Sequence, residues 1–244
     1  ILYRTLAGIQ GARCHEVTFD ADWSLGTSFT AARDGLRLVV VPNPNSPSGT
    51  VMPKSWLLEA ATQLPCPLVI DEAYADFAET DCIDLVRQCE KVIVTRSLSK
   101  SYALAGLRFG FAVARPEIIA QLTKVKDSYN CDALSIAAAT AAIADTSWLA
   151  KNRSQIIATR CRLEAALASL GFRVQPSQAN FVWCTHPEAS HRGIYEALKG
   201  RGILVRWMNF PHWGDGLRIT VGTDEEIDAF LAAVAEILSQ LAAS

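Results

Sequence analysis

The sequence contains no long apolar run, no surplus of one charge and no paired cysteine motif. Its uninterrupted apolar stretches are only a few residues long, so no segment is long enough to cross a bilayer as a helix. The 23 basic and 25 acidic residues give a formal net charge of −2, which provides no basic excess for binding nucleic acid or an anionic membrane. Residues 1–17 carry Arg4 inside an apolar stretch and lack the layout of a signal peptide. We therefore expect a cytoplasmic protein.

The seven cysteines are scattered along the chain, and no two of them form a C-x-x-C pair. An odd number without paired spacing disfavours a disulfide framework and a structural zinc site. We expect mostly buried, reduced thiols and no metal ion. The histidines likewise lack metal-ligand spacing, and they are His15, His186, His191 and His212.

Half of the residues are apolar and a fifth are charged, which provides enough apolar surface for a folded core. In the first half of the chain, short β-branched segments alternate with helix-like segments, a pattern typical of an α/β protein whose mainly parallel sheet is covered on both faces. The strands are expected at 36–41, 67–70, 91–97 and 106–114. The helices are expected at about 54–64, at 82–90 and after Pro116.

The second half begins with an Ala-rich region that predicts one long helical stretch from Leu134 to a C-cap at Gly171. Further strands are expected at 173–185, 202–207 and 217–222, with helices near 190–199 and from Asp224 onward. We predict two domains, a large one over residues 1–144 and a smaller α+β domain over residues 145–244.

Three predicted strands of the first half end at polar residues. These ends carry the loop 43–49, the carboxylate of Asp71 and the hydroxyls and amine of residues 97–100. Ligands of open α/β sheets bind at the carboxyl ends of the strands. Pyridoxal phosphate requires such groups, because its aldehyde needs a lysine, its ring nitrogen a carboxylate, and its phosphate hydroxyls and a guanidinium. No G-x-G-x-x-G segment follows a strand, which disfavours a nicotinamide-binding domain.

Five segments, in this order, give the chain a family resemblance. The sequence resembles the type I fold aminotransferases, and most closely the histidinol-phosphate aminotransferases. The resemblance covers essentially the whole chain. The segments are PNPNSPSGT (42–50), LVIDEAYADF (68–77), TRSLSKSYALAGLRFG (95–110), KDSYN (126–130) and LRITVGT (217–223).

The resemblance implies the pyridoxal-phosphate-dependent transferase type I fold, a homodimer and a set of roles at the cofactor. Lys100 is implied as the Schiff-base lysine and proton shuttle, Asp71 as the partner of the pyridine nitrogen, and Tyr74 as the donor to the phenolic oxygen. The cofactor phosphate is assigned to Ser97, Ser99 and Arg108.

Two arginines match the substrate side of the family pattern, and one loop residue departs from it. Arg218 matches the arginine that binds the substrate carboxylate, and Arg206 matches a second arginine that helps hold the substrate's anionic group. Ser46 stands where the family has an asparagine that contacts the phenolic oxygen of the cofactor. Since a serine hydroxyl is shorter, we expect it to reach that oxygen only through water.

Members of the family carry on the order of a hundred more residues before the position that Ile1 matches. The resemblance implies that this part holds a phosphate-binding turn and the aromatic residue that stacks on the pyridine ring. Tyr3 is then the second tyrosine of that aromatic segment. We expect the 244 residues alone to leave a sheet edge exposed and to bind pyridoxal phosphate poorly.

The resemblance implies transamination between L-histidinol phosphate and 2-oxoglutarate, which gives imidazole-acetol phosphate and glutamate in histidine biosynthesis. Arg206, Arg218 and the segment 126–130 favour this reaction. An aromatic-amino-acid aminotransferase and a threonine-phosphate decarboxylase-like enzyme are alternatives that share the site residues. A non-catalytic module that keeps the fold without holding the cofactor is the alternative from another class.

Overall fold

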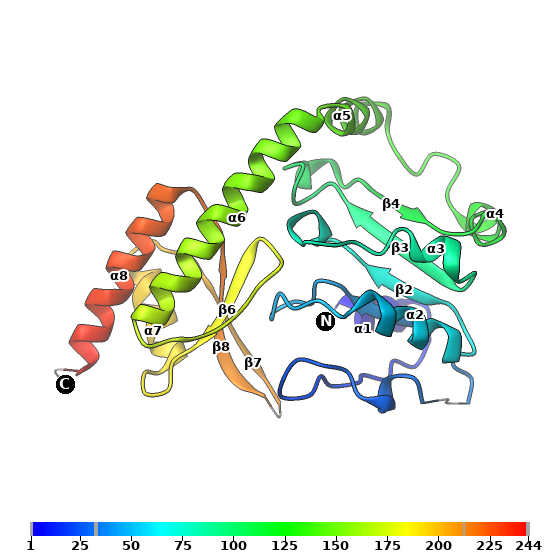
Figure 1. The fold of residues 1–244 in the computed structure, drawn as a ribbon. Coiled ribbons are helices and arrows are strands. Elements are labelled where there is room, and N and C mark those ends of the chain that lie inside the picture. The colour runs from blue at the N-terminus through cyan, green and yellow to red at the C-terminus, as the bar shows by residue number, and fades with distance from the viewer. Residues whose placement is uncertain (1, 32–33, 212, 243–244) are drawn as a thin grey trace.

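The computed structural model describes residues 2–31, 34–211 and 213–242, so the predictions made for Ile1 and His212 fall outside the described residues. Two four-stranded sheets form the centres of two lobes (Figure 1). We call residues 2–144 the first lobe and residues 146–242 the second lobe. The predicted domain boundary falls between helix α5 (Ala133–Ala144) and helix α6 (Thr146–Ser169).

The first sheet has the strand order β1-β2-β3-β4, with β1 (Val39–Pro42), β2 (Leu68–Asp71), β3 (Val92–Ser97) and β4 (Gly110–Val113). The first three strands are parallel, and β4 runs antiparallel to β3. Pro42 pairs with Asp71, which pairs with Thr95. This register brings the polar residues that follow the three parallel strands to one edge of the sheet.

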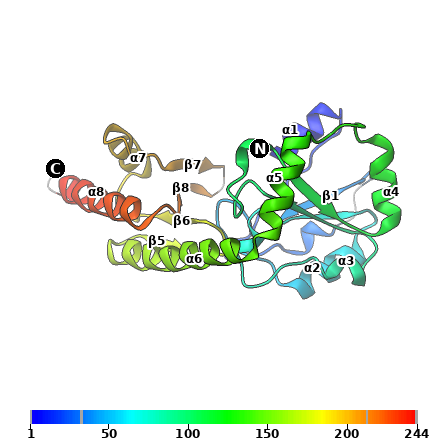
Figure 2. The same ribbon diagram turned by 90° about the horizontal axis from the view of Figure 1, so that it is seen from above.

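A core of apolar side chains on one face of the first sheet holds the first lobe together. The side chains of Leu68, Ile70, Val92 and Val94 are fully buried, because α2 (Lys54–Gln63) and α3 (Leu85–Gln88) pack against their face. Figure 2 shows α1 (Leu2–Ile9), α4 (Pro116–Val125) and α5 on the other side of the sheet. The predicted α/β architecture with a mainly parallel sheet is confirmed.

The second sheet is antiparallel throughout, with the order β5-β6-β8-β7. Its strands are β5 (Arg173–Gln175), β6 (Phe181–Thr185), β7 (Arg206–Phe210) and β8 (Gly214–Thr220). Three helices, α6, α7 (His191–Gly200) and α8 (Asp224–Ala242), cover one face through a core that includes Val182, Leu217 and Ile219. Because side chains alternate along a strand, Phe181, Trp183 and Arg218 lie on the opposite face.

Several elements differ from the sequence prediction. The long helical stretch is two helices, because Asp145 leaves the helical conformation and its carboxylate accepts the Trp148 N–H at 3.0 Å to begin α6. The predicted strand 173–185 is interrupted between β5 and β6, and β7 begins at Arg206 instead of residue 202. Helix α1 was not predicted.

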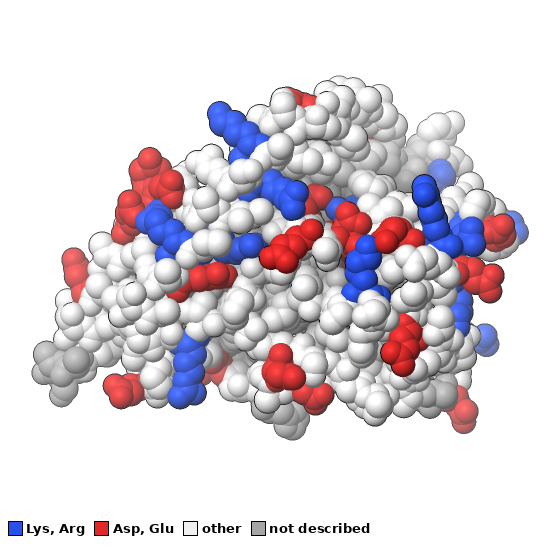
Figure 3. Space-filling view, viewed as in Figure 1, with Lys and Arg blue, Asp and Glu red and all other residues white. Residues whose placement is uncertain are grey.

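Among the described helices, no single one is both long and apolar enough to cross a membrane, and α5 with α6 meets that test only as a pair bent by 74°. On the face seen in Figure 3, basic and acidic side chains are interspersed.

Candidate functional site

The candidate site lies at the carboxyl edge of the first sheet, where β2 and β3 end. Asp71 is the last residue of β2, Tyr74 precedes the short 3-10 helix η2 (Ala75–Phe77), and Lys100 follows β3 by three residues. The neighbouring Glu72 is buried and accepts hydrogen bonds from the Cys82 N–H at 2.5 Å and from Arg96 Nε at 2.8 Å. Glu72 therefore holds the segment that follows β2 in place. Asp71 does not take part in these contacts.

The Asp71 carboxylate is held by two donors. Its Oδ2 accepts a hydrogen bond from the Tyr3 hydroxyl at 2.7 Å, and its Oδ1 accepts the Ala73 N–H at 3.1 Å. Burial and the nearby Asp71 charge raise the pKa of Tyr3. The hydroxyl of Tyr3 thus remains a donor and fixes one side of the carboxylate.

The Lys100 amine lies over the Tyr74 ring, 5.5 Å from the ring centre. Partial burial, followed by the charges of Arg218 and Arg108, lowers the pKa of Lys100. Within the ranges that the structure describes, the amine forms no ion pair with a carboxylate. These effects favour the neutral amine more than in an ordinary lysine, although Lys100 is exposed.

Arg218, on β8 of the second lobe, contacts the first lobe at the candidate site. Its Nη1 donates to Ser46 Oγ at 2.9 Å, and its guanidinium carbon lies 4.9 Å from the centre of the Phe181 ring. The edge of one ring meets the face of the other between Tyr74 and Phe181, with 4.9 Å between centres. The buried Nε of Arg218 has no hydrogen-bond partner among the described residues. This unused donor in a half-buried position suits an anion.

Arg206 lies directly opposite Arg218 in the β7–β8 register. Directly opposed residues of an antiparallel pair project from the same face, so both guanidinium groups belong to the face that carries Phe181. Burial lowers the pKa of Arg218, the Tyr74 hydroxyl opposes this effect, and the Arg206 charge adds to it. Two like charges on one face favour a ligand with more than one negative charge.

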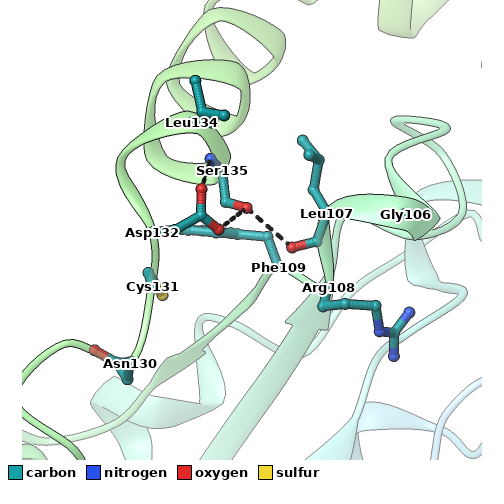
Figure 4. Close-up of a pocket in the computed structure, with 9 residues that line it drawn as sticks. All are labelled: Gly106, Leu107, Arg108, Phe109, Asn130, Cys131, Asp132, Leu134 and Ser135. Carbon is teal, nitrogen blue, oxygen red and sulfur yellow. Dashed lines mark hydrogen bonds between the residues drawn. The ribbon is translucent and has the colours of Figure 1, made fainter.

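The three residues that the resemblance assigns to the cofactor phosphate do not all contact one another. They are Ser97, Ser99 and Arg108. Ser97 Oγ accepts the Ser99 N–H at 3.1 Å, and Arg108 Nη1 donates to the Ala105 carbonyl at 2.8 Å. No described contact links the two serines to Arg108, which lies close enough to Lys100 to lower its pKa. A cavity of about 350 Å³ lies beside Arg108 and is lined also by Asn130, Cys131, Asp132 and Ser135. Figure 4 shows the Arg108 side chain pointing away from Asp132 and Ser135.

The sequence profile of the family described as "Aminotransferase class I and II" matches residues 5–234. The chain belongs to this aminotransferase family. The predicted family resemblance is therefore confirmed.

Curated relatives and a solved structure support the same family. Histidinol-phosphate aminotransferase of Rhodopirellula baltica is 57% identical over 241 residues, which cover 99% of this chain and 67% of that protein. The enzyme of the same name from Geobacter sulfurreducens is 46% identical, over 96% of this chain and 67% of its own length. The structure of the Sinorhizobium meliloti histidinol-phosphate aminotransferase, determined with pyridoxal-5'-phosphate, matches with a TM-score of 0.88 and 28% identity, over 98% of this chain and 68% of that one. The type I fold is thus confirmed.

In this aminotransferase, two residues contact the predicted site residues in a way that the sequence did not predict. Tyr3 contacts a carboxylate 68 positions away, and the Phe181 ring contacts both the Tyr74 ring and the Arg218 guanidinium. The only local signal for Phe181 is the alternation of β6, in which Val182 and Cys184 enter the core of the second lobe. Nothing local indicates that Tyr3 meets Asp71.

Proposed function

We propose that this chain carries out pyridoxal-phosphate-dependent transamination of L-histidinol phosphate with 2-oxoglutarate, giving imidazole-acetol phosphate and glutamate in histidine biosynthesis. The observation that supports it most is the meeting of Lys100, Tyr74 and Arg218 at one sheet edge, with contributions from both lobes. The names and high identity of the curated relatives favour this substrate over an aromatic amino acid or threonine phosphate.

The residues fit pyridoxal phosphate by the chemistry of their side chains. The Lys100 amine, which has no carboxylate partner in the described part of the chain, lies at the same edge of the sheet as the Tyr74 phenol and the Asp71 carboxylate that Tyr3 holds. Lys100 would hold the aldehyde, Asp71 the ring nitrogen and Tyr74 the phenolic oxygen. Ser97, Ser99 and Arg108 would hold the phosphate. Ser46 is engaged by Arg218, so its contact to the phenolic oxygen remains a proposal.

When bound, pyridoxal phosphate supplies an aldehyde that combines with amines and a ring that accepts electrons from the substrate. Lys100, whose lowered pKa favours the neutral amine, would take the proton from the substrate Cα and pass it to the carbon of the cofactor aldehyde. Asp71 would pair with the ring nitrogen and favour its protonated form. The amino group of the donor would stay behind when the keto product leaves, and the acceptor would then enter, so the same residues would serve two half-reactions in turn.

Arg218 and Arg206 would bind the anions of the substrates. Arg218 presents a buried Nε that has no hydrogen-bond partner among the described residues, and Arg206 lies opposite Arg218 on the same face. Both substrates carry the required charge, since 2-oxoglutarate has two carboxylates and histidinol phosphate has a phosphate. A guanidinium matches either group with parallel hydrogen bonds.

We also propose that the working form is a cytoplasmic homodimer and that residues 1–144 and 145–244 are its two domains. Large apolar side chains are exposed on β4, α4 and α5 of the first lobe, among them Phe111, Leu122, Val125 and Leu134. Sedimentation at increasing protein concentration tests the dimer, and a monomer at all concentrations contradicts it.

The proposed reaction is tested by offering the purified protein, with pyridoxal phosphate, three substrates side by side. Histidinol phosphate with 2-oxoglutarate is expected to give glutamate faster than phenylalanine does. Release of CO₂ from threonine phosphate would instead identify a decarboxylase. An absorbance band of the lysine-bound cofactor, absent in Lys100→Ala, distinguishes an enzyme from a non-catalytic module.

A further inference from the structure

A buried arginine joins the two lobes behind the site. Arg160 lies in the middle of α6 and is only 7% exposed. Its Nη1 donates to the Ala179 carbonyl at 2.8 Å in the second lobe and to the Phe77 carbonyl at 3.2 Å in the first lobe. One side chain therefore connects segments about a hundred positions apart.

The surroundings of Arg160 make this contact specific. Its buried Nε has no hydrogen-bond partner among the described residues. Glu164, one helical turn further, accepts the Ser177 N–H at 2.9 Å and opposes the effect of burial, which lowers the pKa of Arg160. Burying a guanidinium is costly, and the cost is reduced only when acceptors are well placed. The acceptors here are the two carbonyls that belong to different lobes.

Each carbonyl is close in sequence to a ring of the candidate site. Phe77 follows Tyr74 by three residues and ends η2, while Ala179 precedes Phe181 by two residues. Ser177 Oγ further fixes this segment, because it donates to the Phe181 carbonyl at 2.6 Å. Holding the carbonyls together therefore holds the edge-to-face contact between Tyr74 and Phe181, on which the Arg218 guanidinium rests.

We propose that Arg160 is a positioning residue that sets the Tyr74–Phe181 contact and, through it, the direction of Arg218 toward the anion of the substrate. This inference rests on the proposed function in one respect, namely that Arg218 binds a substrate anion. The bridging of the two carbonyls by Arg160 does not depend on which substrate is used.

The test compares Arg160→Met with Arg153→Met as a matched control. Arg153 also lies in α6 and donates from Nη2 to the Ala78 carbonyl at 2.8 Å, but it is exposed. Amide hydrogen exchange is measured in the full chain with pyridoxal phosphate, together with kcat and KM for 2-oxoglutarate. In Arg160→Met, the amides of residues 74–79 and 177–181 are expected to exchange faster. The KM for 2-oxoglutarate is expected to rise about tenfold, with a smaller change in kcat. Arg153→Met is expected to stay near wild type in both measurements.

Faster exchange over the whole second lobe, or equal rises of KM in both variants, would show a general structural role and overturn the proposal. If Arg160→Met does not fold, Arg160→Lys decides, since an ammonium is shorter than a guanidinium and is expected to recover only part of the loss. An Arg160→Lys protein with wild-type exchange and KM contradicts the need for this bridge. If wild type turns over none of the substrates but the exchange effect is local, the proposed function fails while the positioning by Arg160 stands.

Discussion

The Lys100 amine lies over an aromatic ring and within the field of two arginines, and the site depends most on this residue. Lys100→Ala is expected to lower the transamination rate by at least about 10²–10⁴, the range for losing a positioned acid–base group. Glutamate formation measures the rate, and thermal unfolding checks that the fold is kept. Lys151→Ala, an exposed lysine of α6, serves as the control. Substantial turnover by Lys100→Ala would contradict the proposed role of Lys100 in transamination.

The charge on Lys100 is predicted to respond to its neighbours. Because burial and the charges of Arg218 and Arg108 lower its pKa, Lys100 should react with an acylating reagent at a lower pH than Lys151 does. Removing one charge in Arg108→Gln relieves part of the repulsion, so the pH midpoint of Lys100 moves upward. Peptide mass spectrometry of protein labelled across a pH series measures both midpoints. A midpoint of Lys100 that moves downward in Arg108→Gln contradicts this account.

Tyr3 is predicted to act through Asp71. Asp71→Asn removes the anion that keeps the ring nitrogen protonated, and a hundredfold loss of kcat would equal about 2.7 kcal/mol. Tyr3→Phe removes only the 2.7 Å hydrogen bond to Oδ2 and is expected to cost less. In the Asp71→Asn background, Tyr3→Phe should cost less still, since residues in direct contact are not additive. Strict additivity of the two losses in kcat would show that Tyr3 acts independently.

At the scale of single elements, helix α7 offers a test of local stability. Ser190 begins α7, and its Oγ accepts the Gly193 N–H at 3.1 Å. Ser190→Ala is expected to lower the free energy of unfolding by about 1 kcal/mol, because a helix loses its N-cap. The effect spreads beyond α7, since Ile194 and Leu198 pack in the core of the second lobe.

Urea unfolding measures the loss in Ser190→Ala. Ser239→Ala is the control, because Ser239 lies within α8 and is exposed, where alanine favours the helix slightly. Equal midpoints for Ser190→Ala and Ser239→Ala would show that the cap contributes nothing measurable.

Local patterns predicted most elements of the first lobe. The β-branched runs give β1, β2 and β3, and α2 matches its predicted range within one residue. The break at Asp145 was not predicted, because an alanine-rich sequence favours a continuous helix. The contact that favours the start of a second helix is the hydrogen bond from the Trp148 N–H to the Asp145 carboxylate. The start of β7 shifted because its pairing with β8 sets the register.

The site residues were predictable where strand ends converge, but their partners were not. Asp71, Tyr74 and Lys100 follow from the parallel order of the strands. The contacts of Tyr3, Phe181 and Arg160 join residues far apart in the sequence, so they depend on how the lobes pack. The predicted roles of all the site residues remain predictions that substitution tests, and the residues are Lys100, Asp71, Tyr74, Ser97, Ser99, Arg108, Ser46, Arg206 and Arg218.

At the scale of the whole molecule, the lobes meet through contacts at the site and at its rim. Arg218 donates to Ser46, the Gln178 N–H donates to the Gly49 carbonyl at 2.8 Å, and the Trp23 and Trp213 rings stack with 4.2 Å between centres. These contacts join the lobe that carries the proposed substrate arginines to the lobe that carries the proposed cofactor-binding residues.

The two arginines of the second lobe are predicted to differ in effect. Arg218→Ala should raise KM for every anionic substrate, since losing a charge-assisted hydrogen bond in a half-buried position costs about 1.5–3 kcal/mol. It also removes the contact to Ser46 between the lobes. Arg206→Ala should raise KM for histidinol phosphate and glutamate and leave phenylalanine unaffected. Equal effects of Arg206→Ala on all three substrates would indicate a structural role for Arg206.

The length of α6 has a mechanical consequence. Its 24 residues follow directly on the turn at Asp145, and Arg162 forms ion pairs with Asp224 and Asp228 of α8, so we call α6 with the attached α8 the arm. At 1.5 Å per residue the arm is about 36 Å long, so a tilt of about 5° at Asp145 displaces its far end by about 3 Å. A displacement of that size equals a whole hydrogen-bond length, whereas Arg160, which lies 15 positions beyond Asp145, would move about two thirds as far. A small tilt at Asp145 would therefore displace residues near the turn least and residues at the outer end of the second lobe most.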